Sequence, residues 1–175
     1  MRGSSHLFAV AALLLASQLA SLCDGLPTAY FTLIVNRTVL QPGRFAQVTV
    51  NGSVPGPVLR VKPGQNVSVT VINALAHEAT TVHWHGMMQR GTPYADGVPG
   101  ATQCVISNQA GHEAMTYSFS VPPTAGTFWY HGHYNEQYID GLYGALVVSD
   151  AADDAALAAG ALAGVGNPRA LAAPC

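Results

Sequence analysis

The sequence predicts an all-β fold, an antiparallel sandwich or barrel of about 120 residues. Three observations support this fold class. Short runs of β-forming residues follow one another, turn-forming Pro and Gly pairs separate these runs, and apolar residues alternate with polar residues within the clearest of them. In addition, between residues 30 and 149 no window of about ten residues shows a convincing helical stripe of apolar residues.

The expected strands can be read in order along the chain. Residues 31–35 and 45–50 are rich in β-branched and aromatic residues, which favour strands. Residues 67–71 and 117–121 place valines or aromatic residues at every second position, so one face of each strand is expected to be buried. The remaining β-rich runs are 80–84, 127–131 and 145–149. The turn signals between them are Pro42-Gly43, Pro55-Gly56-Pro57, Pro63-Gly64, Pro99-Gly100 and Pro122-Pro123.

The first 23 residues have the layout of a secretory signal peptide. Arg2 gives a basic start, residues 7–16 are uniformly apolar, and small residues follow them. The apolar run is shorter than the roughly 20 residues that a membrane-spanning helix needs. We therefore expect residues 1–23 to be a signal peptide, and the mature protein to be secreted without a membrane span. Three N-glycosylation triplets, beginning at Asn36, Asn51 and Asn66, agree with secretion.

The folded domain is expected to cover residues 24–150, because the composition changes abruptly after Asp150. Residues 151–175 are mostly alanine and glycine, with no aromatic residue and no strand alternation. Alanine favours a helix, but such a segment has little apolar surface to bury. The sequence therefore predicts a disordered or aberrant C-terminal tail, of the kind that a truncated gene product would carry.

Composition excludes several classes of function. Charged residues make up 9% of the chain, against about 25% in an ordinary soluble domain. The net charge is −2 and Lys62 is the single lysine, so a basic surface for binding nucleic acid is absent. Of the three cysteines, Cys23 lies in the signal peptide, which leaves Cys104 and Cys175, too few for a disulfide scaffold.

Four of the seven histidines form two His-x-His pairs, His83 with His85 in HWHG and His131 with His133 in HGH. On a β-strand, residues i and i+2 point to the same face, roughly 6.6 Å apart. Both pairs follow strand-like residues, so two neighbouring strands would bring four imidazoles together. Neutral imidazole is a good ligand for copper, zinc, iron or nickel. We interpret the two pairs as parts of one metal site.

Three longer stretches carry a specific resemblance: VNGSVPGPVLRVKPGQNVSVTVIN, HWHGMMQRGTPYADGVPGATQCVI and GTFWYHGHYNEQYIDGLYGALVV. Together, over residues 30–149, they resemble the first plastocyanin-like domain of the multicopper oxidases, a family that includes laccases, ascorbate oxidases and ferroxidases. The resemblance implies a Greek-key sandwich of the cupredoxin type. It also implies an oxidoreductase in which electrons from a phenol, ascorbate or ferrous iron pass through copper to dioxygen, which is reduced to water.

The resemblance also implies roles for individual residues. His83 corresponds to a ligand of the type 2 copper in a trinuclear cluster. His85 and His131 correspond to ligands of one type 3 copper, and His133 corresponds to a ligand of the other type 3 copper. Asp96, in YADG, corresponds to an acidic residue that assists proton delivery to the cluster, although Asp before Gly is also a common turn pair.

The sequence departs from the family in what it lacks. The family cluster takes twice as many histidines as the four this chain offers, and the others come from a later cupredoxin domain with the blue-copper site. That domain would belong to the same longer chain or to another subunit, so we expect the 175-residue chain alone to be inactive as an oxidase. Cys104 corresponds to a cysteine that often forms a disulfide with a distant part of the family chain, and Cys175 is one candidate partner.

Three alternatives remain open from the sequence. A single-domain blue-copper electron carrier needs one Cys, two His and a weak axial ligand, for which Cys104, His112 and Met115 are awkwardly spaced. A zinc or iron enzyme on another β-barrel would usually add a carboxylate ligand. A secreted, non-catalytic copper-binding module would use the same four histidines. His77 and His112 are interpreted as surface residues, and Trp84 and Trp129 as packing in the core or around the site.

Overall fold

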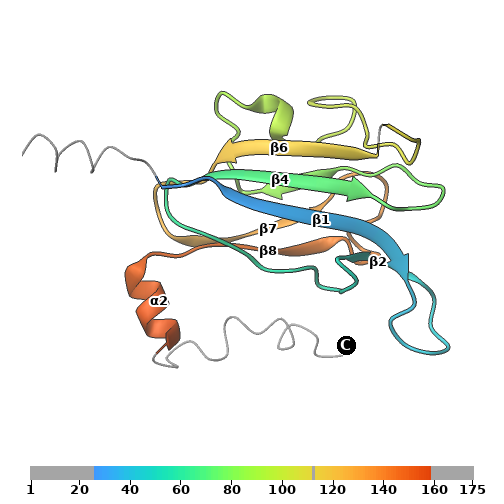
Figure 1. Cartoon of the computed structure of the whole chain (residues 1–175), viewed down its shortest axis with the longest axis horizontal. Coiled ribbons are helices and arrows are strands. Elements are labelled where there is room, and N and C mark those ends of the chain that lie inside the picture. The colour runs from blue at the N-terminus through green and yellow to red at the C-terminus, as the bar shows by residue number, and fades with distance from the viewer. Residues whose placement is uncertain (1–25, 112, 159–175) are drawn as a thin grey trace, which may run out of the picture.

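Two four-stranded β-sheets pack face to face (Figure 1). The first sheet has the strand order β2-β1-β4-β6, and the second has the order β3-β8-β7-β5. The strands are β1 (Ala29–Thr38), β2 (Gln47–Val50), β3 (Leu59–Val61), β4 (Asn66–Asn73), β5 (Val82–His85), β6 (Ala114–Ser120), β7 (Gly126–Gly132) and β8 (Tyr143–Val148). Within residues 26–158, where the structure describes all but residue 112, two short helices accompany them, the 3-10 helix η1 (Pro93–Ala95) and the α-helix α2 (Ala151–Ala158).

The structure, a computed structural model, describes residues 26–111 and 113–158. The expected signal peptide, His112, Cys175 and most of the expected tail therefore lie outside the described residues. No helix within the described residues has the length and apolar character needed to cross a membrane. The all-β sandwich predicted from the sequence is confirmed.

Alternation of apolar and polar residues builds the core between the two sheets. The valines of β4 are buried, while the Ser and Thr residues between them are only partly covered. Trp84 of the second sheet is fully buried and its ring lies 5.4 Å from that of Tyr117 and 5.1 Å from that of Phe119, both in the first sheet. Aromatic side chains bury about 150–250 Å² each, so this contact contributes strongly to holding the sheets together.

Two strand pairs are parallel, where the sequence predicted an antiparallel fold. β1 pairs with β4, and β3 pairs with β8, in the same direction. The chain forms β1 and β2 in the first sheet, crosses to the second sheet as β3, and returns as β4 beside β1. Alternation reports which face of a strand is buried but not the direction of its neighbour. β3 was not predicted, because three residues are too few to show a pattern.

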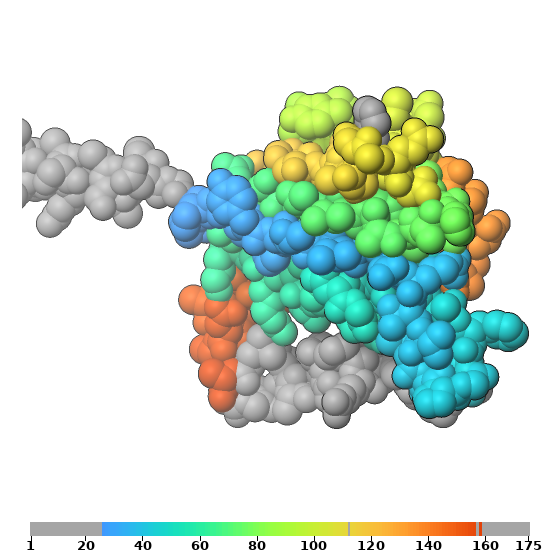
Figure 2. Space-filling view, turned by 45° about the vertical axis from the view of Figure 1, so that its right-hand side comes forward, coloured from blue at the N-terminus to red at the C-terminus, as the bar shows by residue number. Residues whose placement is uncertain are grey.

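The connection between β1 and β2, residues 39–46, is drawn in cyan and projects from the sandwich (Figures 1 and 2). Phe45 lies in this connection with 95% of its surface exposed. The predicted strand 45–50 therefore begins two residues late, at Gln47, where pairing with β1 begins.

The first eight residues of the predicted tail are helical, as α2 shows. The side chain of Asp150 accepts a hydrogen bond of 2.8 Å from the backbone N–H of Ala152, as an N-terminal cap does. Asp154 pairs with Lys62, the residue that follows β3, so the helix is tied to the sandwich. Residues 151–158 thus form a helix, and the expected boundary of the domain at residue 150 stays a prediction. The rest of the tail lies outside the described residues.

Candidate metal centre

The two His-x-His pairs lie on neighbouring strands of the second sheet, β5 and the end of β7. In the antiparallel register His83 lies opposite His131. Trp84 and Tyr130 point into the core from the same two strands and are fully buried. Successive side chains of a strand point to opposite faces, so the histidines project from the other face of the sheet. The alternation that fills the core therefore also places the imidazoles together.

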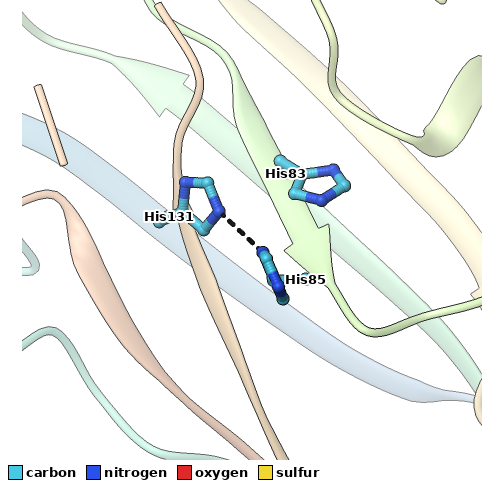
Figure 3. A group of neighbouring side chains, drawn as sticks. All are labelled: His83, His85 and His131. Atoms are coloured by element: carbon cyan, nitrogen blue, oxygen red, sulfur yellow. Dashed lines mark hydrogen bonds between the residues drawn. The ribbon is translucent and has the colours of Figure 1, made fainter. Parts of the chain in front are cut away.

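The four imidazole rings gather around His83. Its ring centroid lies 5.6 Å from that of His85, 5.3 Å from that of His131 and 5.5 Å from that of His133. The candidate ligand nitrogens of His83, His85 and His131 all lie within 4.8 Å of one another. In Figure 3, His131 and His85 point toward each other, with 3.4 Å between Nε2 of His131 and Nδ1 of His85. Three nitrogens at this spacing can bind a metal ion.

His133 differs from the other three. The sequence placed it on a strand with His131, whereas β7 ends at Gly132 and His133 is the first residue beyond it. Its ring lies 6.0 Å from that of His131 and nearly parallel to it, at 24°. His133 is exposed and is not in the group of three close nitrogens. It therefore lies beside the group, where a second ion could be reached.

Backbone carbonyls fix the orientation of two imidazoles. Nδ1 of His83 lies 2.7 Å from the carbonyl oxygen of Asp96, and Nδ1 of His131 lies 2.9 Å from that of Gly132. A carbonyl can only accept a hydrogen bond, so each Nδ1 carries the proton and donates it. Nε2 of both rings is then left with a free lone pair. A ligand histidine is commonly oriented in this way by a hydrogen bond from its other ring nitrogen.

The protonation state of His131 also suits metal binding. Its side chain is buried, with 9% exposed. Burial lowers the pKa of His131, and the neighbouring imidazoles of His83, His85 and His133 lower it further, against the opposing hydrogen bond to Gly132. The neutral form, which is the form that binds metal, is favoured.

Aromatic rings form a wall beside the histidines. The ring of Trp129 lies 4.1 Å from that of His131 at 30°, and 5.1 Å from that of His85. Tyr138 lies 5.7 Å from His131 on the β7–β8 connection. Trp129 therefore packs against the site, whereas Trp84 packs in the core. Tyr138 had no signal in the sequence, because only the path of the connection brings it to the site.

Asp96 lies beside His83 and also in a turn. It follows η1, and one carboxylate oxygen is 3.5 Å from Nδ1 of His83, farther than its own carbonyl oxygen. The next residue, Gly97, has a φ of +87°, and a Cβ there would lie 1.9 Å from the carbonyl oxygen of Val82. Only glycine lets this turn approach β5 so closely. The two interpretations of Asp96 from the sequence are thus compatible.

Comparison with known proteins decides the family. Residues 35–153, more than half of the chain, match the family described as "Multicopper oxidase". The chain belongs to the multicopper oxidase family. The prediction of a cupredoxin-type fold is therefore confirmed, and so is copper as the cofactor of the family.

Among its relatives are two laccases. Laccase-2 of Botryotinia fuckeliana is 40% identical over 126 residues, which cover 71% of this chain and 21% of that protein. Laccase-1 of Trametes villosa is 42% identical over 130 residues, or 71% of this chain and 24% of the laccase. This chain thus spans between a fifth and a quarter of the length of these multicopper oxidases.

Solved structures give the same result. The laccase of Botrytis aclada matches with a TM-score of 0.62 and 40% identity, over 70% of this chain and 22% of the laccase. Fet3p, described as a multicopper oxidase that functions in iron import, matches with a TM-score of 0.62 and 33% identity, over 71% of this chain and 24% of its own.

The geometry gives no support to a blue-copper site within the part of the chain that the structure describes. His83, His85 and His131 form the one group there of three or more close His, Cys, Asp or Glu ligands. Cys104 is exposed, and His112 and Cys175 lie outside the described residues. Met115 lies on β6 of the first sheet, whereas the histidine pairs of this multicopper oxidase chain lie on the second.

Proposed function

We propose that this chain is the copper-binding N-terminal domain of a secreted multicopper oxidase. In this proposal His83, His85, His131 and His133 are ligands of its copper cluster. The observation that carries it is the convergence of three ligand nitrogens within 4.8 Å, from two paired strands. The residues present fit copper, because two of the imidazoles are oriented by carbonyls with Nε2 free and the donor set is all nitrogen.

Each histidine has a definite task in this proposal. His85 and His131, with facing nitrogens 3.4 Å apart, would share one ion, since metal–imidazole bonds are about 2.0–2.1 Å long. His83 and His133, whose ring centroids lie 5.5 Å apart, would each reach another copper. Bound copper supplies the one-electron chemistry by which a reductant is oxidised and dioxygen is reduced to water. The chain's residues orient the ligands, and Trp129 shields one side of them from water.

Asp96 is proposed to deliver protons for oxygen reduction. Its side chain is 28% exposed, and one carboxylate oxygen lies 3.5 Å from Nδ1 of His83, so it contacts both solvent and the site. A carboxylate in such a place can take a proton from water at Oδ1 and release it toward the reacting oxygen atoms. Its backbone carbonyl, by contrast, has the separate task of orienting His83.

Asp96→Asn separates these two tasks. The substitution keeps the carbonyl, so Cu(II) affinity is expected to stay within about threefold, less than the ~10–100-fold that loss of an orienting partner costs. In the complete oxidase, turnover is expected to fall about 10²–10⁴-fold, the usual contribution of general acid catalysis. Chelator competition measures the affinity and oxygen uptake measures the turnover, with Asp153→Asn in α2 as the control. A turnover equal to that of the control would remove Asp96 from the proton path.

The remaining ligands and the blue-copper site are proposed to come from further cupredoxin domains, in the same longer chain or in another subunit. Trp129 is 37% exposed and Tyr138 43% exposed, and both lie beside the histidines. Exposed aromatic side chains around a site suit a face that another domain covers. The reductant would be a phenol, ascorbate or ferrous iron, and the names of the relatives, laccases and an iron-import oxidase, point to the first and third.

Secretion and glycosylation belong to the same proposal. They rest on the signal-peptide layout of residues 1–23, and on the triplets that begin at Asn36, Asn51 and Asn66. Asn36 and Asn66 are exposed residues of β1 and β4. Secretion of the protein with loss of residues 1–23, found by mass spectrometry of the medium, is the expected result.

Metal titration of the purified 175-residue chain tests the central proposal. We expect Cu(II) to bind with nitrogen couplings in the electron paramagnetic resonance spectrum, without intense blue colour. We expect no oxygen uptake with a phenol, ascorbate or ferrous iron. Loading with zinc but not copper would favour a zinc enzyme, and an intense blue colour would favour an electron carrier. Oxygen uptake by the chain alone would contradict the proposed need for further domains.

A further inference from the structure

A buried amide lies next to the histidine site without belonging to it. Gln137 is in the connection between β7 and β8, just after His133. Its side chain is 3% exposed, whereas its neighbours Glu136 and Tyr138 are exposed. A buried amide needs hydrogen-bond partners, because leaving its polar atoms unpaired is costly. The partners of Gln137 therefore indicate what it holds in place.

Among the described residues, the partners of this amide all lie in the segment that leads into β5. Oε1 of Gln137 accepts a hydrogen bond of 2.8 Å from the hydroxyl of Thr80. Nε2 donates to the carbonyl oxygen of Ala79 at 2.9 Å and to Oε2 of Glu78 at 3.3 Å. The side chain thus ties the segment that precedes the first histidine pair to the connection that follows the second pair.

The other side of Gln137 supports the second pair directly. A Cβ on Gly132 would lie 3.2 Å from Cβ of Gln137, so Gly132, between His131 and His133, packs against it. The backbone N–H of Leu142 donates to the carbonyl of Gln137 at 2.9 Å, and that of Gly132 donates to the carbonyl of Leu142 at 2.9 Å. Displacement of Gln137 would therefore move both histidines of this pair.

An ion pair holds one of the amide's partners. Nε of Arg37, on β1, donates to Glu78 at 2.6 Å, and Nη1 donates to Asp140 at 2.6 Å. The hydrogen bond from Arg37, and a weaker one from Gln137, hold the pKa of Glu78 below its usual value. Glu78 therefore remains a carboxylate that accepts from the amide. Asp140 lies in the same connection as Gln137, so Arg37 adds a second tie between the two segments.

We propose that Gln137 is a positioning residue that sets how the two histidine pairs lie relative to each other. The inference rests on the proposed function, since it concerns metal ligands only if the histidines bind metal. The position requires both a donor and an acceptor. A glutamate there would place a second carboxylate against Glu78 and the carbonyl of Ala79, with no proton to donate.

Gln137→Glu, at nearly constant volume, tests the inference in two ways, with Gln109→Glu at an exposed glutamine as the matched control. In the metal-free chain, the imidazole nitrogen resonances of His83, His131 and His133 are expected to shift. Chelator competition is expected to show Cu(II) bound about 10–100-fold more weakly, the range for loss of a residue that orients ligands. Urea unfolding of each variant allows affinities to be compared for folded protein.

The outcomes are distinct. A lower unfolding midpoint with unchanged histidine resonances and Cu(II) affinity would show that Gln137 only stabilises the fold, and would overturn the inference. If the unaltered chain binds no copper, the proposed function fails, and the metal-free resonances alone decide the inference. If Gln137→Glu does not fold, Glu78→Gln replaces it, because that change removes the charged acceptor and keeps the volume. Its expected effects have the same direction and are smaller, and unchanged resonances would again overturn the inference.

Discussion

Replacement of His131 by alanine is expected to lower the Cu(II) affinity of the chain more than ~100-fold, above the range for losing an orienting partner. His131 is the most buried of the four imidazoles, and its ring centroid lies between 5.3 and 6.0 Å from those of His83, His85 and His133. Its Nε2 also faces Nδ1 of His85 at 3.4 Å. The substitution therefore removes the nitrogen that completes the close group.

Replacement of His133 by alanine is expected to lower the Cu(II) affinity less, because this ring lies outside the group of three close nitrogens. His77→Ala, at an exposed histidine outside both pairs, is the control and is expected to leave the affinity unchanged. Chelator competition at one pH ranks the variants, and urea unfolding shows that each is folded. A larger loss of Cu(II) affinity in His133→Ala than in His131→Ala would contradict the geometry proposed for the ligands.

The sequence predicted the sandwich because burial leaves a strong pattern in a strand. Residues 67–71 alternate in the sequence and in their exposure, and they lie within β4. Neither the short strand β3 nor the parallel pairing of β1 with β4 had such a signal. Direction and sheet membership depend on where the chain crosses between layers, which no local pattern records.

The histidine site was predictable for the same reason. A pair at i and i+2 on a strand must share a face, whatever the rest of the fold does. The groups that orient the site were not predictable, because they are the carbonyls of Asp96 and Gly132 and the amide of Gln137. Every residue type has a carbonyl, and a glutamine in a polar loop has nothing unusual in its sequence context. Their roles depend on long-range register, which is visible only in three dimensions.

Gly97→Ala is expected to lower the free energy of unfolding by about 2–5 kcal/mol. Its φ of +87° costs about 1–2 kcal/mol for a residue with a Cβ. Overpacking adds about 1–3 kcal/mol, because the new Cβ would lie 1.9 Å from the carbonyl oxygen of Val82 and 2.9 Å from Cα of His83. Both are backbone atoms that cannot move independently of the strand, so the turn itself must move away from β5 to make room for the Cβ.

Gly91→Ala is the matched control that separates the two costs. Gly91 also has a positive φ, +79°, but a Cβ there would meet nothing within 4 Å, so only the cost of about 1–2 kcal/mol applies. Urea unfolding gives the difference between the variants. The retreat of the turn also draws the carbonyl of Asp96 away from His83, so Gly97→Ala is expected to weaken Cu(II) binding about tenfold. Equal free energies of unfolding in the two variants would mean that the turn can move away from β5 without loss of stability. Its close approach would then not hold His83 in place.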